Sequence, residues 1–332
     1  MQQIKTIKRL TILISLIIGL SSCQQDLVFE NFNNPKVWEE SQTTPNSIYN
    51  GVEYILKGFE QFDLVAIGES HGIREVTDFY IELVNNENFR RHVDAIVFEL
   101  GNSLYQEDLD DYILGITNDT LSIKKLWRDH SSSFLQSGDR SGVSRFFKEV
   151  RQINQSSEHK IRILAAEPPI EWSTIKNTED VFKYIDQRDQ FYADVVVGEV
   201  INKEQKALLI MGSQHFNKCK PPHRKADNPL SAIRRATHKN MVLITTMTSD
   251  KLPFDQLPNI NKGDVIETVN PIIGELTIEN SSNNDCPLKF QTDALLYLGN
   301  MSNLSYEEQT PFNDQRYEKE LKRRMDLVKL RQ

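Results

Sequence analysis

The sequence predicts an α/β fold in which a mainly parallel sheet is flanked by helices. Two observations support this prediction. Short apolar runs typical of strands buried on both faces recur along the chain, and segments with helical periodicity lie between them. With 332 residues, 39% of them hydrophobic, the chain can bury one large core or two modest ones. Its charged fraction of 26% and its lack of low-complexity stretches exclude disordered, collagenous and coiled-coil classes.

The predicted elements alternate along most of the chain. The apolar runs, each four or five residues long, are typical of strands rather than helices because of that length. The predicted strands are residues 64–67, 95–98, 161–165, 207–211, 241–244 and 294–298. The predicted helices are residues 75–91, 143–153, 178–201 and 229–238.

Two stretches depart from simple alternation. The 62 residues between Phe98 and Ile161 exceed what one crossover helix needs, so a helical insert is expected at about 104–155, where it could cover a pocket. In the C-terminal half, residues 266–269 and 275–278 flank Pro271 and Gly274, a pattern that predicts a hairpin.

The N-terminus has the order of a secretory leader. Three basic residues precede an apolar run of 11 residues, from Leu10 to Leu20, and Ser21-Ser22-Cys23 follows. A helix that spans a bilayer needs about 20 apolar residues, so a permanent transmembrane anchor is not expected. The segment Leu20-Ser21-Ser22-Cys23 resembles a bacterial lipobox, which implies cleavage before Cys23 and lipidation of its thiol. Several acyl chains would then hold the protein on a membrane.

The expected organisation is a signal peptide at 1–22, a lipidated Cys23 with a polar tether to residue 50, and a single α/β domain at 51–332. Removing the leader leaves 36 basic and 47 acidic residues, a formal charge of −11, so a nucleic-acid partner is not expected. The expected location is the bacterial cell envelope, at the outer membrane or the periplasmic face. Outside the leader, at most one disulfide can form, between Cys219 and Cys286.

Acidic and imidazole side chains follow four of the predicted strands. Because the carboxyl ends of parallel strands meet at one edge of a sheet, where ligands of open α/β sheets bind, these residues are expected to converge. Glu69 and His71 are two apart on an extended segment and so point to one side. The predicted catalytic residues are Glu69, His71, Glu99, Glu167 and His215.

Packed carboxylates repel one another, so something must compensate them. One possibility is that they hold the two histidines in defined tautomers, with one histidine taking a proton from water that attacks an ester or amide. The other is that Glu69, His71 and His215 bind a divalent metal. A serine nucleophile is less favoured, because Gly212-Ser213-Gln214-His215 lacks the Gly-x-Ser-x-Gly pattern.

At these residues the chain resembles the superfamily of erythromycin esterase-like hydrolases, ChaN-like haem-binding lipoproteins and Tiki/TraB proteins. The resemblance covers about residues 60–300. Its motifs are Gly68-Glu69-x-His71, Phe98-Glu99, Gly212-Ser213-Gln214-His215, the helix segment Arg188-Asp189-x-x-x-Ala193, and the strand 293–299.

The esterase-like relatives imply a hydrolase that needs no cofactor, in which His71 is the general base, Glu69 and Glu99 are its electrostatic partners, and Glu75 and Arg188 contact the substrate. Arg188 is also the candidate for neutralising the carboxylates, the alternative being a structural salt bridge between helix and sheet. A single residue between Glu69 and His71 is a spacing more like ChaN and Tiki, which makes erythromycin a doubtful substrate. The ChaN-like relatives imply a haem- or iron-binding uptake lipoprotein with His or Tyr ligands. The Tiki-like relatives imply a metal-dependent protease. The expected partner is therefore a small-molecule substrate or haem.

Overall fold

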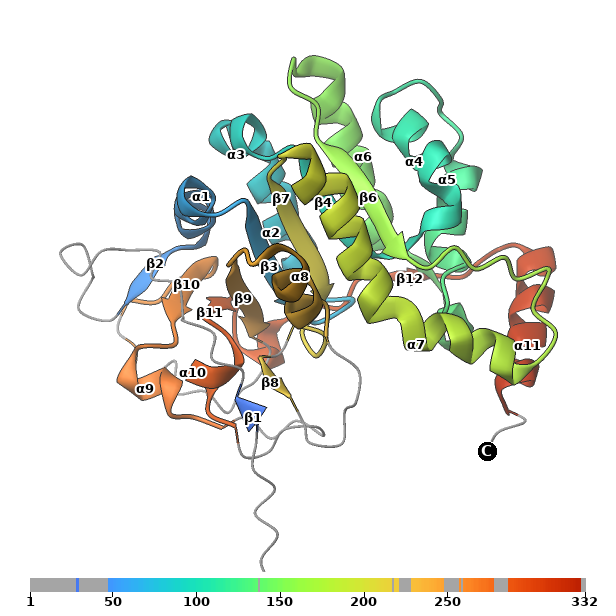
Figure 1. Ribbon diagram of the computed structural model, residues 1–332. Helices are drawn as coiled ribbons and strands as arrows, with labels where there is room; N and C mark the ends of the chain where they lie inside the picture. Colours follow the sequence, from blue (N-terminus) through green and yellow to red (C-terminus); the bar gives the residue numbers. More distant parts are fainter. Residues whose placement is uncertain are drawn as a thin grey trace, which may run out of the picture.

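The computed structural model describes residues 28–29, 47–136, 138–216, 218–220, 228–247, 257, 259–277 and 286–329. Its centre is an eight-stranded sheet in the order β2-β10-β11-β9-β3-β7-β4-β6, in which neighbours from β11 to β6 are parallel (Figure 1). This confirms the predicted fold class, and all six predicted strands lie in the parallel part. The parallel strands are β11 (Ala294–Tyr297), β9 (Val242–Met247), β3 (Leu64–Glu69), β7 (Ala207–Gly212), β4 (Ala95–Asn102) and β6 (Arg162–Glu167).

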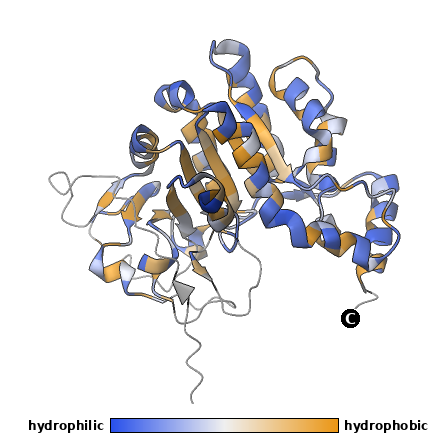
Figure 2. Ribbon diagram, in the orientation of Figure 1, coloured by the Kyte–Doolittle hydropathy of each residue, from blue (hydrophilic) through white to orange (hydrophobic). Residues whose placement is uncertain are grey.

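Helices cover both faces of the sheet because the strands are apolar on both faces. One face, with Val65 and Ile67 of β3, packs on α1 (Gly51–Gln61), α2 (Arg74–Asn85), α3 (Glu87–His92) and α6 (Ser141–Ser156). The other face, with Leu64 and Ala66, packs on α7 (Thr178–Val195) and α8 (Pro229–Thr237). Figure 2 shows the apolar colour concentrated on the central strands and the polar colour on the outer sides of the helices.

The predicted insert between β4 and β6 is helical. It contains α4 (Gln106–Ile113), α5 (Thr120–Arg128) and α6, and a short strand β5 (Asp139–Arg140) precedes α6. Strand β5 pairs with β12 (Gln309–Thr310), which connects the insert to the C-terminal part of the chain. Beyond β12, helix α11 (Gln315–Lys329) packs against the insert and α7 (Figure 1). The C-terminal part of the chain therefore holds the insert in place through β12 and α11.

The hairpin predicted at residues 266–269 and 275–278 does not form: its first half is a strand, but that strand pairs with other partners. The first half forms β10 (Asp264–Glu267), which pairs antiparallel with β11 and with β2 (Ile48–Asn50) instead of with the residues that follow it. Pro271–Gly274 forms a helical turn, α9, and another turn, α10 (Leu288–Gln291), precedes β11. The reason is physical: β10 extends the sheet and completes the burial of Ile266, whose neighbours across the ladder are Leu295 and Ile48.

Cys219 and Cys286 form a disulfide, the one pairing that the sequence allows outside the leader. It joins β8 (Cys219–Lys220), which pairs with β1 (Val28–Phe29), to the segment before α10. The predicted leader, Cys23 and most of the predicted tether lie outside the described residues. Within the described part of the chain, no helix combines the length and the apolar character needed to span a membrane.

Candidate functional site

The carboxyl ends of β3, β4, β6 and β7 bring the five predicted side chains together. Glu69 ends β3, Glu99 lies in β4 and Glu167 ends β6; their exposed fractions are 8%, 2% and 1%. His71 and His215 lie in the turns that follow β3 and β7. Three carboxylates this deeply buried require compensation by nearby cations or hydrogen-bond donors.

Glu69 and His71 form the outer part of this cluster. The Nδ1 atom of His71 lies 2.7 Å from Oε1 of Glu69, and the hydroxyl of Tyr80 on α2 donates to Oε2 of Glu69 at 2.7 Å. The turn is closed by Gly72, whose φ of +79° suits glycine. Because a carboxylate accepts hydrogen bonds, the neutral His71 ring carries its proton on Nδ1 and leaves Nε2 as the basic nitrogen.

Glu99 lies between the two histidines. Its Oε2 is 3.5 Å from His71 Nε2, and its Oε1 is 3.7 Å from His215 Nε2. The backbone N–H of Gly212 also donates to Oε2 at 2.6 Å. Burial opposes the ionisation of Glu99, but His71, His215, Arg188 and the Gly212 N–H outweigh it and lower the pKa of Glu99 to about 2. Glu99 therefore stays ionised near neutral pH and places a negative charge close to Nε2 of both histidines.

Arg188 on α7 compensates the inner carboxylates. Its guanidinium binds Oε1 of Glu99, and its Nε lies 2.6 Å from Oε1 of Glu167. The hydroxyl of Ser131 donates to Oε2 of Glu167 at 2.6 Å. Burial raises the pKa of Glu167 by more than the charge of Arg188 lowers it, so the net pKa is raised. The structure places Arg188 in ion pairs with Glu99 and Glu167, as expected of the residue that neutralises the carboxylates; its contact with a substrate stays a prediction.

His215 is held from the opposite side by Asp189, the residue after Arg188. The Nδ1 atom of His215 lies 2.6 Å from Oδ1 of Asp189. Each of the two site histidines thus has its Nδ1 on one carboxylate and its Nε2 near the shared Glu99. The fractions of the His71 and His215 side chains that are exposed, 36% and 20%, make His71 the more accessible imidazole.

The pKa of His71 is raised above its ordinary value. Burial lowers it, but the hydrogen bond to Glu69 and the charges of Glu99 and Glu69 together outweigh burial and the opposing charge of Arg140. A nearby carboxylate favours the protonated imidazole, so His71 gains its basic form at a higher pH than a free histidine does.

Some of these partners were not predicted as site residues from the sequence. Asp189 was part of the Arg-Asp motif and could have been assigned from it, whereas Tyr80 and Ser131 carry no signal of their own in the sequence. His130 is buried with Nδ1 4.0 Å from Oε1 of Glu167, and burial lowers the pKa of His130 well below the ordinary value. Glu75, on α2, is buried and accepts the Ser305 backbone N–H at 2.9 Å.

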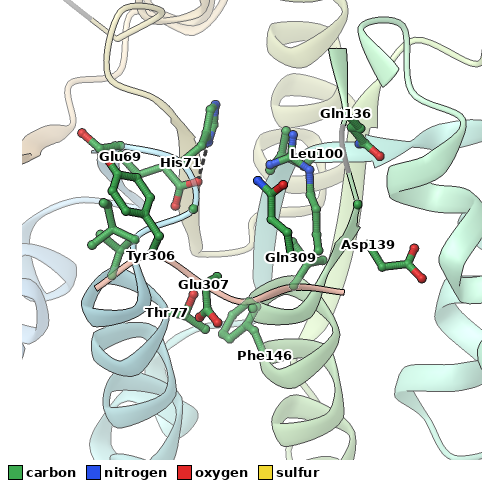
Figure 3. Close-up of a pocket in the computed structure, with 18 of the residues that line it drawn as sticks. Glu69, His71, Thr77, Leu100, Gln136, Asp139, Phe146, Tyr306, Glu307 and Gln309 are labelled. Carbon is green, nitrogen blue, oxygen red and sulfur yellow. Dashed lines mark hydrogen bonds and ion pairs between the residues drawn. The ribbon is translucent and has the colours of Figure 1, made fainter. Parts of the chain in front are cut away.

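A cavity of about 250 Å³ lies beside His71, between α2, the insert and the segment around β12. Figure 3 shows Glu69 and His71 on one side of it and Gln136 and Asp139 on the other, with Phe146 of α6 lower in the view. Much of the apolar lining comes from α2, β4 and α6. These apolar residues include Val76, Phe98, Leu100, Val143 and Phe146. The predicted role of the insert as a cover for a pocket is therefore consistent with where the cavity lies.

The side chains at the site bear on whether it could hold a metal or haem. In the part of the chain that the structure describes, no group of three or more His, Cys, Asp or Glu side chains could hold a metal ion. The cation that compensates Glu99 and Glu167 is Arg188. A cavity of about 250 Å³ is also small for a haem macrocycle, since cofactor pockets measure roughly 300–1,000 Å³. These residues fit neither group.

No family model and no curated protein matches the chain. Among solved structures, it is similar to the type III effector HopBA1 (12% identity, 77% of this chain and 98% of that chain covered, TM-score 0.40) and to a protein from Bacillus cereus (12%, 74% and 90%, TM-score 0.49). It is also similar to ChaN of Campylobacter jejuni, described with cofacially bound haem (14%, 79% and 96%, TM-score 0.36). A ChaN protein, a group that the sequence motifs resemble, is thus among its structural neighbours.

Proposed function

We propose that this protein hydrolyses a small ester or a related bond, with His71 as the general base. The observation that carries the proposal is the geometry of His71: an accessible imidazole at a cavity, with Nδ1 held by Glu69 and Glu69 held by Tyr80. A base, a group that orients it and a space for the reacting molecule are the parts that acid–base hydrolysis needs.

In the proposed reaction, Nε2 of His71 takes a proton from water while the water oxygen bonds to the carbonyl carbon. The tetrahedral intermediate then breaks its bond to the leaving oxygen, which receives that proton from His71. Glu99, ionised and 3.5 Å from Nε2, stabilises the imidazolium formed between the two steps. Glu69 keeps the ring in the productive tautomer throughout. Glu167, Arg188 and His215 are assigned to holding Glu99 in place and charged.

The test is a screen of short-chain 4-nitrophenyl esters with the purified full chain, followed by His71→Ala. General base removal is expected to lower kcat/KM by roughly 10²- to 10⁴-fold. His92→Ala is the matched control, because His92 is an exposed histidine on α3 that contacts only the backbone of its own helix among the described residues. Equal hydrolysis by wild type and His71→Ala would overturn the proposal.

The sequence resemblance also implies haem- or iron-binding uptake and metal-dependent proteolysis. The same purified protein, prepared without chelator, separates these functions by elemental analysis and an absorbance spectrum. A metal-free and haem-free protein that hydrolyses esters supports the proposal. A Soret band lost on removal of His71, or activity abolished by chelation and restored by manganese, would replace it with the respective alternative.

We also propose that the protein is anchored by lipid on Cys23 in the bacterial cell envelope. The leader pattern supports this, and so does the Cys219–Cys286 disulfide, because disulfides persist mainly in oxidising compartments outside the cytosol. Labelling with a fatty acid analogue tests the anchor: the label should enter the wild-type chain and be lost in Cys23→Ser.

A further inference from the structure

Arg140 stands out among the residues that line the cavity. It lies in β5, directly before α6, so both the β5–β12 pair and the helix fix its backbone. Its Nε is buried without a hydrogen-bond partner, and in the described part of the chain its guanidinium forms no ion pair within 4.0 Å. A largely buried cation that forms no direct ion pair is costly, so its retention needs a reason.

The carboxylates that line the same cavity are all engaged elsewhere. Asp139 binds Arg128 through two hydrogen bonds of 2.7 Å, and Glu307 binds Arg145 at 2.7 Å. Glu69 is held by His71 and Tyr80. Arg140 is thus a cation in the cavity lining whose negative neighbours already have partners.

Arg140 is also close to the proposed base. Its charge opposes protonation of His71 and of His130, while Glu69 and Glu99 favour the charged guanidinium. Burial lowers the pKa of Arg140, but arginine stays protonated in proteins because its ordinary pKa is far above neutrality. A molecule in the cavity beside His71 would therefore also lie within reach of the positive charge of Arg140.

We propose that Arg140 binds an oxyanion of the substrate, so that the protein acts on small molecules that carry a carboxylate or a phosphate besides the bond to be broken. A guanidinium binds either group through paired, charge-assisted hydrogen bonds, which gives orientation as well as affinity. The apolar wall formed by Val76, Phe98 and Phe146 suits the short carbon chain that joins the anion to the reacting carbonyl. This inference deepens the proposed function and rests on it for the identity of the anion as part of a substrate.

The first test measures binding and needs no turnover. Titration calorimetry on the full chain would compare glutarate and methyl phosphate with the neutral dimethyl glutarate. One of the anions should bind at least 10-fold more tightly than the diester, and the better of the two identifies the oxyanion. Arg140→Gln should weaken that anion by roughly 10- to 100-fold, with Arg140→Lys intermediate because it keeps the charge and loses the planar fork.

The control is Arg316→Gln, which removes an exposed arginine on α11 and should leave binding unchanged. If the diester binds wild type as well as the anions do, or if the anion binds Arg140→Gln as well as wild type, the inference is wrong. The wild-type comparison decides the matter even if Arg140→Gln does not fold.

The second test measures hydrolysis. The 4-nitrophenyl monoesters of succinate and glutarate would be compared with 4-nitrophenyl butyrate. The ratio of kcat/KM for charged over neutral ester should exceed about 10 in wild type and fall towards 1 in Arg140→Gln. Anion binding through Arg140 without hydrolysis of any ester would keep this inference and overturn the hydrolase. Hydrolysis by wild type with a ratio of kcat/KM near 1 would keep the proposed hydrolase and overturn the inference about Arg140.

Discussion

The Nδ1 atom of His71 lies 2.7 Å from the Oε1 atom of Glu69, two residues earlier in the chain. Side chains two apart on an extended segment point the same way, so this contact is built within one strand end and needs no distant element. What fixes the pair from outside is the Tyr80 hydroxyl, which occupies the other oxygen of Glu69 at 2.7 Å. The base and the group that orients it thus form one unit between β3 and α2.

Tyr80→Phe tests whether this orientation matters for turnover. The change removes one hydroxyl and leaves the buried ring in place, so Glu69 is free to rotate away from His71. We expect kcat to fall by roughly 10-fold, since partners that orient a functional histidine typically contribute about 10- to 100-fold. Steady-state kinetics on the best ester from the screen provide the measurement. Tyr112→Phe, a buried tyrosine on α4 outside the cavity, should keep wild-type kinetics.

The pH dependence of hydrolysis follows from the raised pKa of His71. The general base must be neutral, so activity is lost as the pH falls through that pKa and is regained above it. We expect kcat/KM to rise with pH with an apparent pKa above 6.5, the ordinary histidine value. In Glu69→Gln the acceptor charge is gone, and the rise should shift to lower pH together with a lower plateau. A profile with the same midpoint in both proteins would contradict the role of Glu69.

The sequence was sufficient to predict the strands and the residues that end them. Runs such as Leu64–Ile67 are apolar on both faces, and this pattern determines both that they are strands and that they lie in the parallel part of the sheet. The convergence of Glu69, Glu99 and Glu167 follows from that parallel arrangement. Partners supplied by distant elements could not be predicted, because a lone tyrosine or serine in a helix or turn has no periodicity or motif that marks its target.

Arg140 and the partner of β10 illustrate the same limit. Arg140 reaches the cavity because β5 pairs with β12, a contact between residues about 170 positions apart that neither short strand signals by itself. Likewise, Pro271 and Gly274 are typical of a turn, and a turn is present, but whether its flanks pair with each other depends on which edge of the sheet is free. Long-range pairing, rather than local propensity, determined both outcomes.

Glu99 and Arg188 are expected to dominate the stability of the site. Removing one partner of a buried ion pair leaves the other uncompensated, so Arg188→Gln and Glu99→Gln should each lower the free energy of unfolding by roughly 3–5 kcal/mol. Urea denaturation at neutral pH measures this. Glu82→Gln, at an exposed position on α2, is the matched control and should change the free energy of unfolding by less than about 0.5 kcal/mol.

The pH dependence of that stability gives Glu99 a signature of its own. Its pKa falls from the ordinary value of 4.5 to about 2 in the folded protein, so its contribution is present above pH 4.5 and is lost as the pH falls towards 2. The stability difference between wild type and Glu99→Gln should therefore shrink over this range. The pKa of Glu167 is raised in the folded protein, so Glu167 makes the free energy of unfolding change with pH in the opposite direction. The comparison with Glu99→Gln is needed to separate the contribution of Glu99. A difference that stays constant from pH 6 to pH 3 would contradict the assignment.

Gly212 ends β7 at a point where a Cβ would be packed tightly against the site. A Cβ at this position would lie 3.0 Å from Nε2 of His71, which is proposed to take the proton from water. It would lie 3.4 Å from Oε2 of Glu99, which is proposed to stabilise the resulting imidazolium. Gly212→Ala should therefore displace the His71 ring and lower kcat/KM by at least about 10-fold, because small displacements of catalytic groups are costly. The hydrogen bond from the Gly212 N–H to Glu99 involves the backbone and is kept in the variant.

Gly198→Ala is the control, since a Cβ there meets no atom within 4 Å and alanine favours a helical backbone. It should retain full activity with equal or higher stability. Unimpaired hydrolysis by Gly212→Ala would show that the contact between His71 and Glu99 is dispensable, and the proposed role of Glu99 in stabilising the imidazolium would have to be abandoned.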